Sequence, residues 1–300
     1  MLEASKTKAL LSLLEDSEQE VWQAAYAALA ALPYSDTEAL QNHLYESTDL
    51  HETQSRLEKC IVDIRISHFG DQIINWKNKG GVNLLEALVY ICQFRYPDVS
   101  EAEIIEQIET LRLDAWLEFH YDLTAFEKVK ILNYILFQLH GFRGNEENFL
   151  HHDNSFINKV LQSKKGNPIS LSIVYMLVAQ RLNIPVYGIN LPKHFIMAYV
   201  EDEETNNLEG FNDKPSIGSE AKGDIIFYIN AYNGGGVFNQ EQLQGILKEM
   251  ELEEKPEFMQ PCSNADIVLR VLMNLHNSYS VAEKYEAEFI DRIVQKYKEN

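Results

Sequence analysis

The residues of this chain that could do chemistry fall in three short segments. The first is Gly166-Asn-Pro-Ile-Ser170, which reads as a helix start with Asn167 as its cap and Pro168 at the first helical position. The second segment contains His194 and the third ends at Asn230, each within a run typical of a β-strand. A nucleophile at a helix start, a histidine base and a group that orients the base together support nucleophilic catalysis. The spacing therefore predicts a site where a helix begins beside a sheet.

The first position of the expected helix is occupied by Pro168. Proline has no thiol, hydroxyl or N–H, so thiol chemistry is excluded there. Ser170 lies two residues further along the expected helix, where its side chain points about 200° away from that position. One interpretation is a binding site that has lost its chemistry. The other is a hydrolase or acyltransferase, peptidase-like, that uses Ser170 and His194.

Further polar residues could line the same cleft. Arg143 could bind a carboxylate or carbonyl oxygens there, or it could simply tie loops together. Asn233 opens Asn-Gly-Gly-Gly236, which can expose backbone N–H groups, although a tight strand-to-helix turn is the simpler interpretation. The predicted binding cleft consists of Arg143, Asn167, Pro168, Ser170, His194, Asn230 and Asn233.

The run His151-His152-Asp153 has residue types that bind metals. Adjacent side chains diverge unless the loop bends, and no third or fourth ligand is spaced nearby. We therefore expect no bound metal, and nothing in the sequence predicts a cofactor.

The elements that must position these residues are mostly helices. Their limits follow from apolar periodicity, capping residues and the positions of proline and glycine. In chain order we expect a helical hairpin similar to one HEAT-type repeat at 8–32, a largely helical region at 53–141, a helix at 168–182, strands at 186–190, 194–200 and 224–230, and helices at 240–250, 265–279 and 281–298. A polar, acidic excursion at 201–223 separates the last two strands.

The composition limits the classes of function. The 300 residues are 45% hydrophobic and 11% aromatic, which suits a large core and not a disordered chain. A formal net charge of −20 disfavours nucleic acid and anionic membrane surfaces as partners, and no apolar run reaches the length of about 20 residues that spans a membrane. The three cysteines are an odd number and widely separated, which indicates reduced thiols in a cytoplasmic protein. We expect Cys60 and Cys92 in the core and Cys262 in a linker far from the motifs.

Six motifs, in order, resemble one family: Gly141-Phe-Arg-Gly-Asn145, Asn154-Ser-Phe156, Gly166-Asn-Pro-Ile-Ser-Leu171, Tyr187-Gly188, Pro192-Lys-His-Phe195 and Asn233-Gly-Gly235. Over roughly 80–245 they are similar to the transglutaminase-like superfamily, in the branch typified by an enterobacterial invasion-gene regulator (SirB-type), where a tetratricopeptide-like tail often follows. A related domain occurs beside an F-box in eukaryotes. The resemblance implies a papain-like core and aligns the Cys-His-Asp triad of the superfamily with Pro168, His194 and Asn230.

We therefore expect an α-rich α+β protein. A transglutaminase-like domain at 67–255 would follow a helical, HEAT-like region at 1–66 and precede a C-terminal helical pair at 262–300. The expected function is a non-catalytic binding or regulatory role with an unknown protein or peptide partner. The alternatives are a hydrolase or acyltransferase and a helical interaction scaffold. A hydrogen bond between His194 and a hydroxyl group in an open pocket would favour the hydrolase or acyltransferase.

Overall fold

The computed structural model describes residues 4–46, 51–120, 122–201, 223–249, 251, 255–279 and 284–299. The chain forms two compact units, Met1–Ile73 and Ile74–Asn300. The acidic excursion predicted at 201–223 lies almost wholly outside the described residues. None of the helices described is both long and apolar enough to cross a membrane.

The N-terminal unit is helical, with α1 (Ala4–Leu13), α2 (Gln19–Ala30), the 3-10 turn η1 (Tyr34–Asp36), α3 (Thr37–Glu46) and the first part of α4 (His51–Asn78). The hairpin predicted at 8–32 is confirmed, because α1 and α2 pack together. Leucines of this hairpin share a core with Leu40, Leu57 and Ile61 of the following helices. This unit therefore buries its own apolar face, and its likeness to a HEAT-type repeat stays a prediction.

The larger unit has helices on both sides of a small sheet, which confirms the predicted α+β class. Its elements are α5 (Leu84–Arg95), α6 (Glu101–Glu118), α7 (Ala125–Asn133) continued by a π-helix η2 (Tyr134–Leu139), β1 (Arg143–Gly144), η3 (His152–Ser155), α8 (Ile157–Ser163), β2 (Lys165–Gly166), α9 (Pro168–Arg181), β3 (Val186–Leu191), β4 (His194–Glu201), β5 (Asp224–Asn230), η4 (Ala231–Asn233), β6 (Gly236–Phe238), α10 (Gln240–Glu249), η5 (Pro256–Met259), α11 (Asn264–Tyr279) and α12 (Lys284–Glu299).

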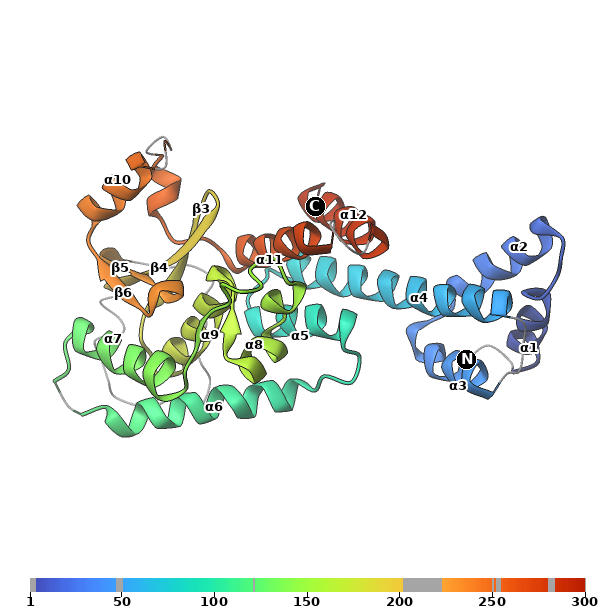
Figure 1. The fold of residues 1–300 in the computed structure, drawn as a ribbon, viewed down its shortest axis with the longest axis horizontal. Coiled ribbons are helices and arrows are strands. Elements are labelled where there is room, and N and C mark those ends of the chain that lie inside the picture. Colours follow the sequence, from blue (N-terminus) through green and yellow to red (C-terminus); the bar gives the residue numbers. More distant parts are fainter. Residues whose placement is uncertain are drawn as a thin grey trace. The chain divides into compact units, whose positions relative to one another are not determined.

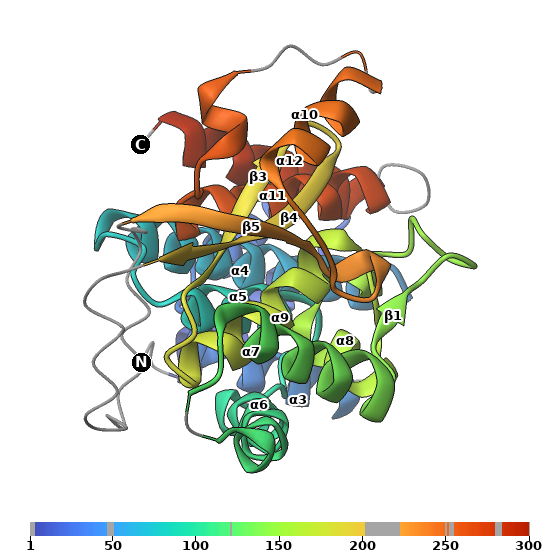
Figure 2. The same ribbon diagram turned by 90° about the vertical axis from the view of Figure 1, so that its left-hand side faces the viewer.

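The four-stranded sheet is antiparallel throughout and has the order β3-β4-β5-β6. On one face, alternate residues such as Ile189, Ile196 and Ala198 form a buried cluster with Leu243 and Leu247 of α10. No residue of α9 belongs to that cluster, although α9 packs against β3 and β4. The two helices therefore cover opposite faces, and both views place the sheet between α10 and α9 (Figures 1 and 2).

Helix α9 is the central element of this unit. Every residue from Ile169 to Ala179 is buried, as expected of a helix that is apolar on all sides. It packs against α6, α8, β3, β4 and α11. The helix predicted at 168–182 is thus confirmed, and its fixed position gives its N-terminus a defined place in the fold.

Candidate functional site

The start of α9 is capped as the sequence predicts. Asn167 Oδ1 accepts the backbone N–H of Ser170 at 3.0 Å, and the N–H of Asn167 donates to Ser170 Oγ at 3.0 Å, which completes a reciprocal capping box. Pro168 occupies the first turn, where no backbone N–H is needed. The first helical position thus holds a residue suited to starting a helix.

Neither nearby serine offers a hydroxyl for nucleophilic attack. Ser170 Oγ also donates to the carbonyl of Asn167 at 3.2 Å, and the side chain is only 3% exposed. Ser172 is fully buried and donates at 2.8 Å to the carbonyl one turn earlier. A Cβ on Gly166 would lie 2.6 Å from Ser170 Oγ, so the chain closes tightly over this hydroxyl. Among the described residues, His194 makes no hydrogen bond to either serine.

The motif residues around the helix start form a buried polar network. Asn167 Nδ2 donates to Ser155 Oγ at 3.0 Å. Asn154, which is buried, accepts from Asn145 Nδ2 at 2.8 Å and donates to two carbonyls of its own loop. The N–H of Asn145 donates to the carbonyl of Gly166 at 3.0 Å. This network fastens the preceding loop to the start of α9, so the asparagines of these motifs have a structural role.

Replacing Asn167 with alanine should destabilise the protein. The change removes the cap and leaves the buried hydroxyl of Ser155 without this donor, so we expect a loss of about 1–3 kcal/mol in the free energy of unfolding. Urea denaturation measures this. Asn239→Ala is the matched control, because Asn239 caps α10 through an exposed bond of 2.9 Å to the N–H of Gln242 and should cost about 1 kcal/mol or less. Equal losses for the two variants would contradict a stabilising role for the buried network.

His194 begins β4 directly after the hairpin residues Pro192 and Lys193 and is exposed. It lies opposite Leu191, a member of the cluster that α10 covers. Residues paired across antiparallel strands share a face, so His194 lies on the α10 face. The motif order predicts that His194 faces the start of α9, but the pairing of β3 with β4 places it on the face of the sheet that α10 covers. Burial lowers the pKa of His194, and the positive charges of Arg270 and Lys193 lower it further.

Asn230 ends β5, the strand next to β4, as predicted. Its Oδ1 accepts the N–H of Asn233 at 3.3 Å, and its carbonyl accepts the N–H of Gly235 at 2.9 Å. Gly235 has φ +77°, and a Cβ there would lie 2.0 Å from Asn133 Oδ1, so the turn requires glycine. Asn133 Nδ2 donates to the carbonyl of Gly235 at 2.7 Å. Asn230 therefore caps a turn that is tied to α7.

Arg143 and Asn233 are both exposed. The backbone N–H of Arg143 donates to the carbonyl of Lys164 at 2.9 Å, where β1 meets β2, and its guanidinium has no hydrogen bond or ion pair with any residue described. The predicted cleft residues thus divide into the cap of α9, where Asn167 and Ser170 are buried, and a separate set of exposed or half-buried side chains, with no hydrogen bond between the two groups. A hollow on the surface lies in the N-terminal unit, lined by Glu18, Gln19, Glu20 and Gln23.

The three cysteines are all poor nucleophiles. Cys60 and Cys92 are buried, which confirms the prediction for both, and burial raises the pKa of each thiol to about 12. Cys262 lies in the connection between η5 and α11, as predicted, but the expectation that it is far from the motifs was wrong, because its N–H donates to the carbonyl of Gly188 at 2.8 Å. Burial raises the pKa of Cys262 to about 12 as well. Thiols of this kind are almost wholly protonated at neutral pH and react slowly.

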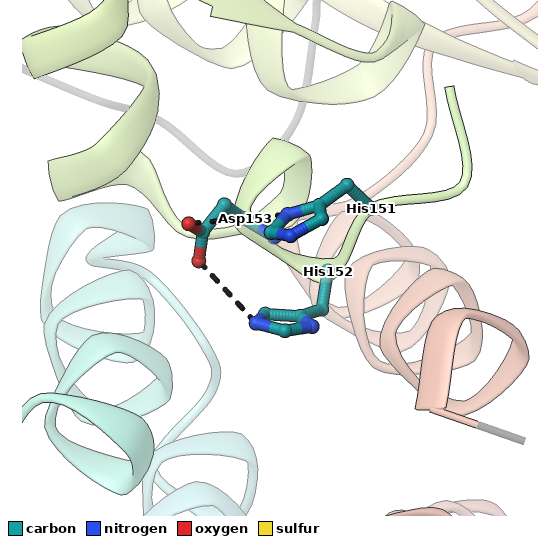
Figure 3. A group of neighbouring side chains, drawn as sticks. All are labelled: His151, His152 and Asp153. Carbon is teal, nitrogen blue, oxygen red and sulfur yellow. Dashed lines mark hydrogen bonds and ion pairs between the residues drawn. The ribbon is translucent and has the colours of Figure 1, made fainter. Parts of the chain in front are cut away.

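The loop at His151, His152 and Asp153 bends enough to bring one potential ligand atom of each residue within 4.8 Å of the others (Figure 3). The bend is the exception that the sequence analysis allowed, so these side chains do not diverge. His151 Nδ1 already accepts the N–H of Asp153 at 3.2 Å, and the two imidazole rings stack with centroids 4.5 Å and planes 28° apart. Ring nitrogen lone pairs lie in the ring planes, so stacked rings direct them away from a shared ion. The arrangement suits a hydrogen-bonded loop better than a metal centre.

Comparisons with known proteins agree with the resemblance read from the motifs. A family model described as the transglutaminase-like superfamily matches residues 102–273. A UPF0162 protein of Xylella fastidiosa (strain Temecula1) is 26% identical over 237 residues, which cover 73% of this chain and 75% of that protein. F-box only protein 21 of Mus musculus is 30% identical over 150 residues, which cover 43% of this chain and 24% of that protein. No solved structure matches the chain.

Proposed function

Because the chain belongs to the transglutaminase-like superfamily, whose chemistry starts from a cysteine at a helix start, we propose that it is a member that binds a partner without catalysis. The observation that carries this proposal is the start of α9. Pro168 stands at the nucleophile position, and the Ser170 hydroxyl is held in the cap. Covalent catalysis needs a nucleophile with a base in hydrogen-bond reach. Without that pair, acyl transfer has no first step.

Within the superfamily we place the chain in the SirB-type branch, on the six motifs quoted above. In that branch, α11 and α12 would belong to the start of the tetratricopeptide-like region. The domain limits 1–66, 67–255 and 262–300 stay predictions.

The partner we propose is a protein or peptide. The net charge of −20 opposes binding to nucleic acid or to an anionic membrane. The loop held by the asparagine network carries two exposed apolar side chains, Phe149 at 50% and Leu150 at 64% exposure. Tyr232 packs its ring against Phe149 beside the turn that follows β5. Exposed apolar and aromatic groups on a fixed loop support a role in protein contacts.

An activity assay tests the loss of catalysis. We expect no turnover of p-nitrophenyl acetate, and no transfer of a primary amine to a glutamine-containing peptide with or without calcium, because no activated nucleophile is present. A fluorophosphonate probe should likewise leave Ser170 unmodified in the mass spectrum of the intact protein. If the protein turns over the ester and the probe attaches to Ser170, the hydrolase alternative is correct. The probe keeps this test valid even if Ser170→Ala, which removes a cap bond, does not fold.

A further inference from the structure

The end of the β3–β4 hairpin gathers basic groups from two elements. Arg270 of α11 donates through Nη1 to Asn190 Oδ1 at 3.1 Å and to the carbonyl of Leu191 at 3.2 Å. Leu191 is paired with His194, and Lys193 completes the turn between them. Lys193 and His194 are both exposed. The guanidinium thus reaches the residue directly across from His194, at the open end of the hairpin.

The charge of Arg270 has no acidic partner in the part of the chain that the structure describes. Its acceptors are an amide oxygen and a carbonyl oxygen, and Nε and Nη2 have no protein acceptor. Arg181 is a useful contrast to the partly buried Arg270, since the Nε of Arg181 lies 3.1 Å from a carboxylate oxygen of Glu109. Burial lowers the pKa of both arginines. The Glu109 carboxylate offsets the effect for Arg181, whereas for Arg270 the offset comes from the Cys262 thiol, which is protonated at neutral pH because its own pKa is raised. A buried charge without a counter-charge is costly.

The surroundings of His194 are positive too. The groups that change its pKa are Arg270 on α11 and Lys193 in the turn, and both lower it. No carboxylate of α10, which packs on the same face, contributes, and neither does one from another described element. Among the residues that the structure describes, no carboxylate is a shared neighbour of these three basic groups.

We propose that the hairpin end is an oxyanion-binding site, in which Arg270, Lys193 and His194 receive a carboxylate or phosphate group of the partner. Arg270 is held by Asn190 and the Leu191 carbonyl, so its remaining N–H groups are already oriented for an oxyanion. This inference rests on the proposed binding function and specifies the chemistry of the ligand. It also assigns His194 a role in binding that needs no nucleophile.

An NMR titration of the full chain tests the site. The imidazole signal of His194 is identified by its loss in His194→Gln. Its chemical shift is then followed against pH at fixed ionic strength in four solutions, which contain sodium chloride alone, sodium phosphate, N-acetylglycine, or the uncharged amide of N-acetylglycine. An anion next to the ring stabilises the protonated form, so we expect the pKa of His194 to rise by about one unit with at least one of the two anions. The amide should leave it unchanged. A response to phosphate alone identifies a phosphate ligand, and a response to N-acetylglycine alone identifies a carboxylate.

Three variants separate this site from general charge effects. Arg270→Gln should weaken the binding of the responding anion at least about tenfold, since it removes the bidentate group. This variant also loses two bonds to the hairpin, so Lys193→Gln, in the exposed turn, is the second probe and should weaken binding about two- to fivefold. Arg292→Gln removes an exposed charge of α12 and should change nothing. No shift in the folded protein with either anion, or equal shifts in all variants, would overturn the proposal. Either of these results would refute the oxyanion site but not the proposed function. Catalytic turnover in the activity assay would refute the proposed function.

Discussion

A cysteine introduced by Pro168→Cys reacts with iodoacetamide much faster than any native cysteine. The helix N-terminus stabilises a thiolate and lowers its pKa below the free value of about 8.5. The native thiols have a pKa of about 12, so at pH 7 roughly one in 10⁵ is ionised. Allowing for the lower nucleophilicity of an acidic thiol, we expect the labelling rate to exceed that of each native cysteine by at least about 100-fold. Peptide mass spectrometry after timed labelling measures all four sites in one sample.

Ser163→Cys is the matched control for this experiment. Ser163 is exposed and ends α8, where the negative end of the helix dipole disfavours a thiolate. It should label more slowly than Pro168→Cys, by about tenfold. If the two label equally fast, the alignment of Pro168 with the nucleophile of the superfamily loses its support. Adding His194→Gln to Pro168→Cys should not change the rate, because His194 lies on the α10 face of the sheet; a fall in rate would show that the histidine does reach the helix start.

Phe156→Ala should cost about 3–5 kcal/mol in the free energy of unfolding. The ring of Phe156 is fully buried and meets the ring of Tyr96 edge-on at 5.3 Å between centroids. Removing it leaves a cavity at the point where η3 leads into α8, next to the asparagine network. Urea denaturation with intrinsic fluorescence measures the loss.

Phe149→Ala is the matched control on the same loop. Phe149 is 50% exposed, so its removal should cost less than about 1 kcal/mol. Similar losses for the two variants would mean that the motif around Phe156 does not anchor the loop. If Phe149→Ala weakens partner binding while stability is kept, the proposed contact surface gains support.

Local features of this chain could be predicted from the sequence because they depend on neighbouring residues. The capping box of Asn167 and Ser170 joins positions three apart. Proline favours the first helical position because its own ring fixes a helical φ angle there. Strands β3, β4 and β5 follow from runs of β-branched and aromatic residues. Strand β6 was not predicted, because three residues that begin with glycine carry almost no such signal.

The order of the motifs, and hence the superfamily, also followed from the sequence. The resemblance aligns Pro168 with the nucleophile of the superfamily, and this prediction needed no coordinates. The loss of thiol chemistry at this point is a matter of residue type.

Tertiary structure decided which side chains meet. The alternation of side chains along β4 places His194 and Phe195 on opposite faces of the sheet. Helix α10, which lies more than forty residues later in the chain, decides which of these faces is covered by a helix together with His194. Arg270 reaches the hairpin because α11 packs against β3, and in sequence it is one more residue of an amphipathic helix. Cys262 meets Gly188 for a similar reason. Such contacts depend on how whole elements pack. Periodicity and composition describe only one element at a time, so neither predicts a contact between two elements.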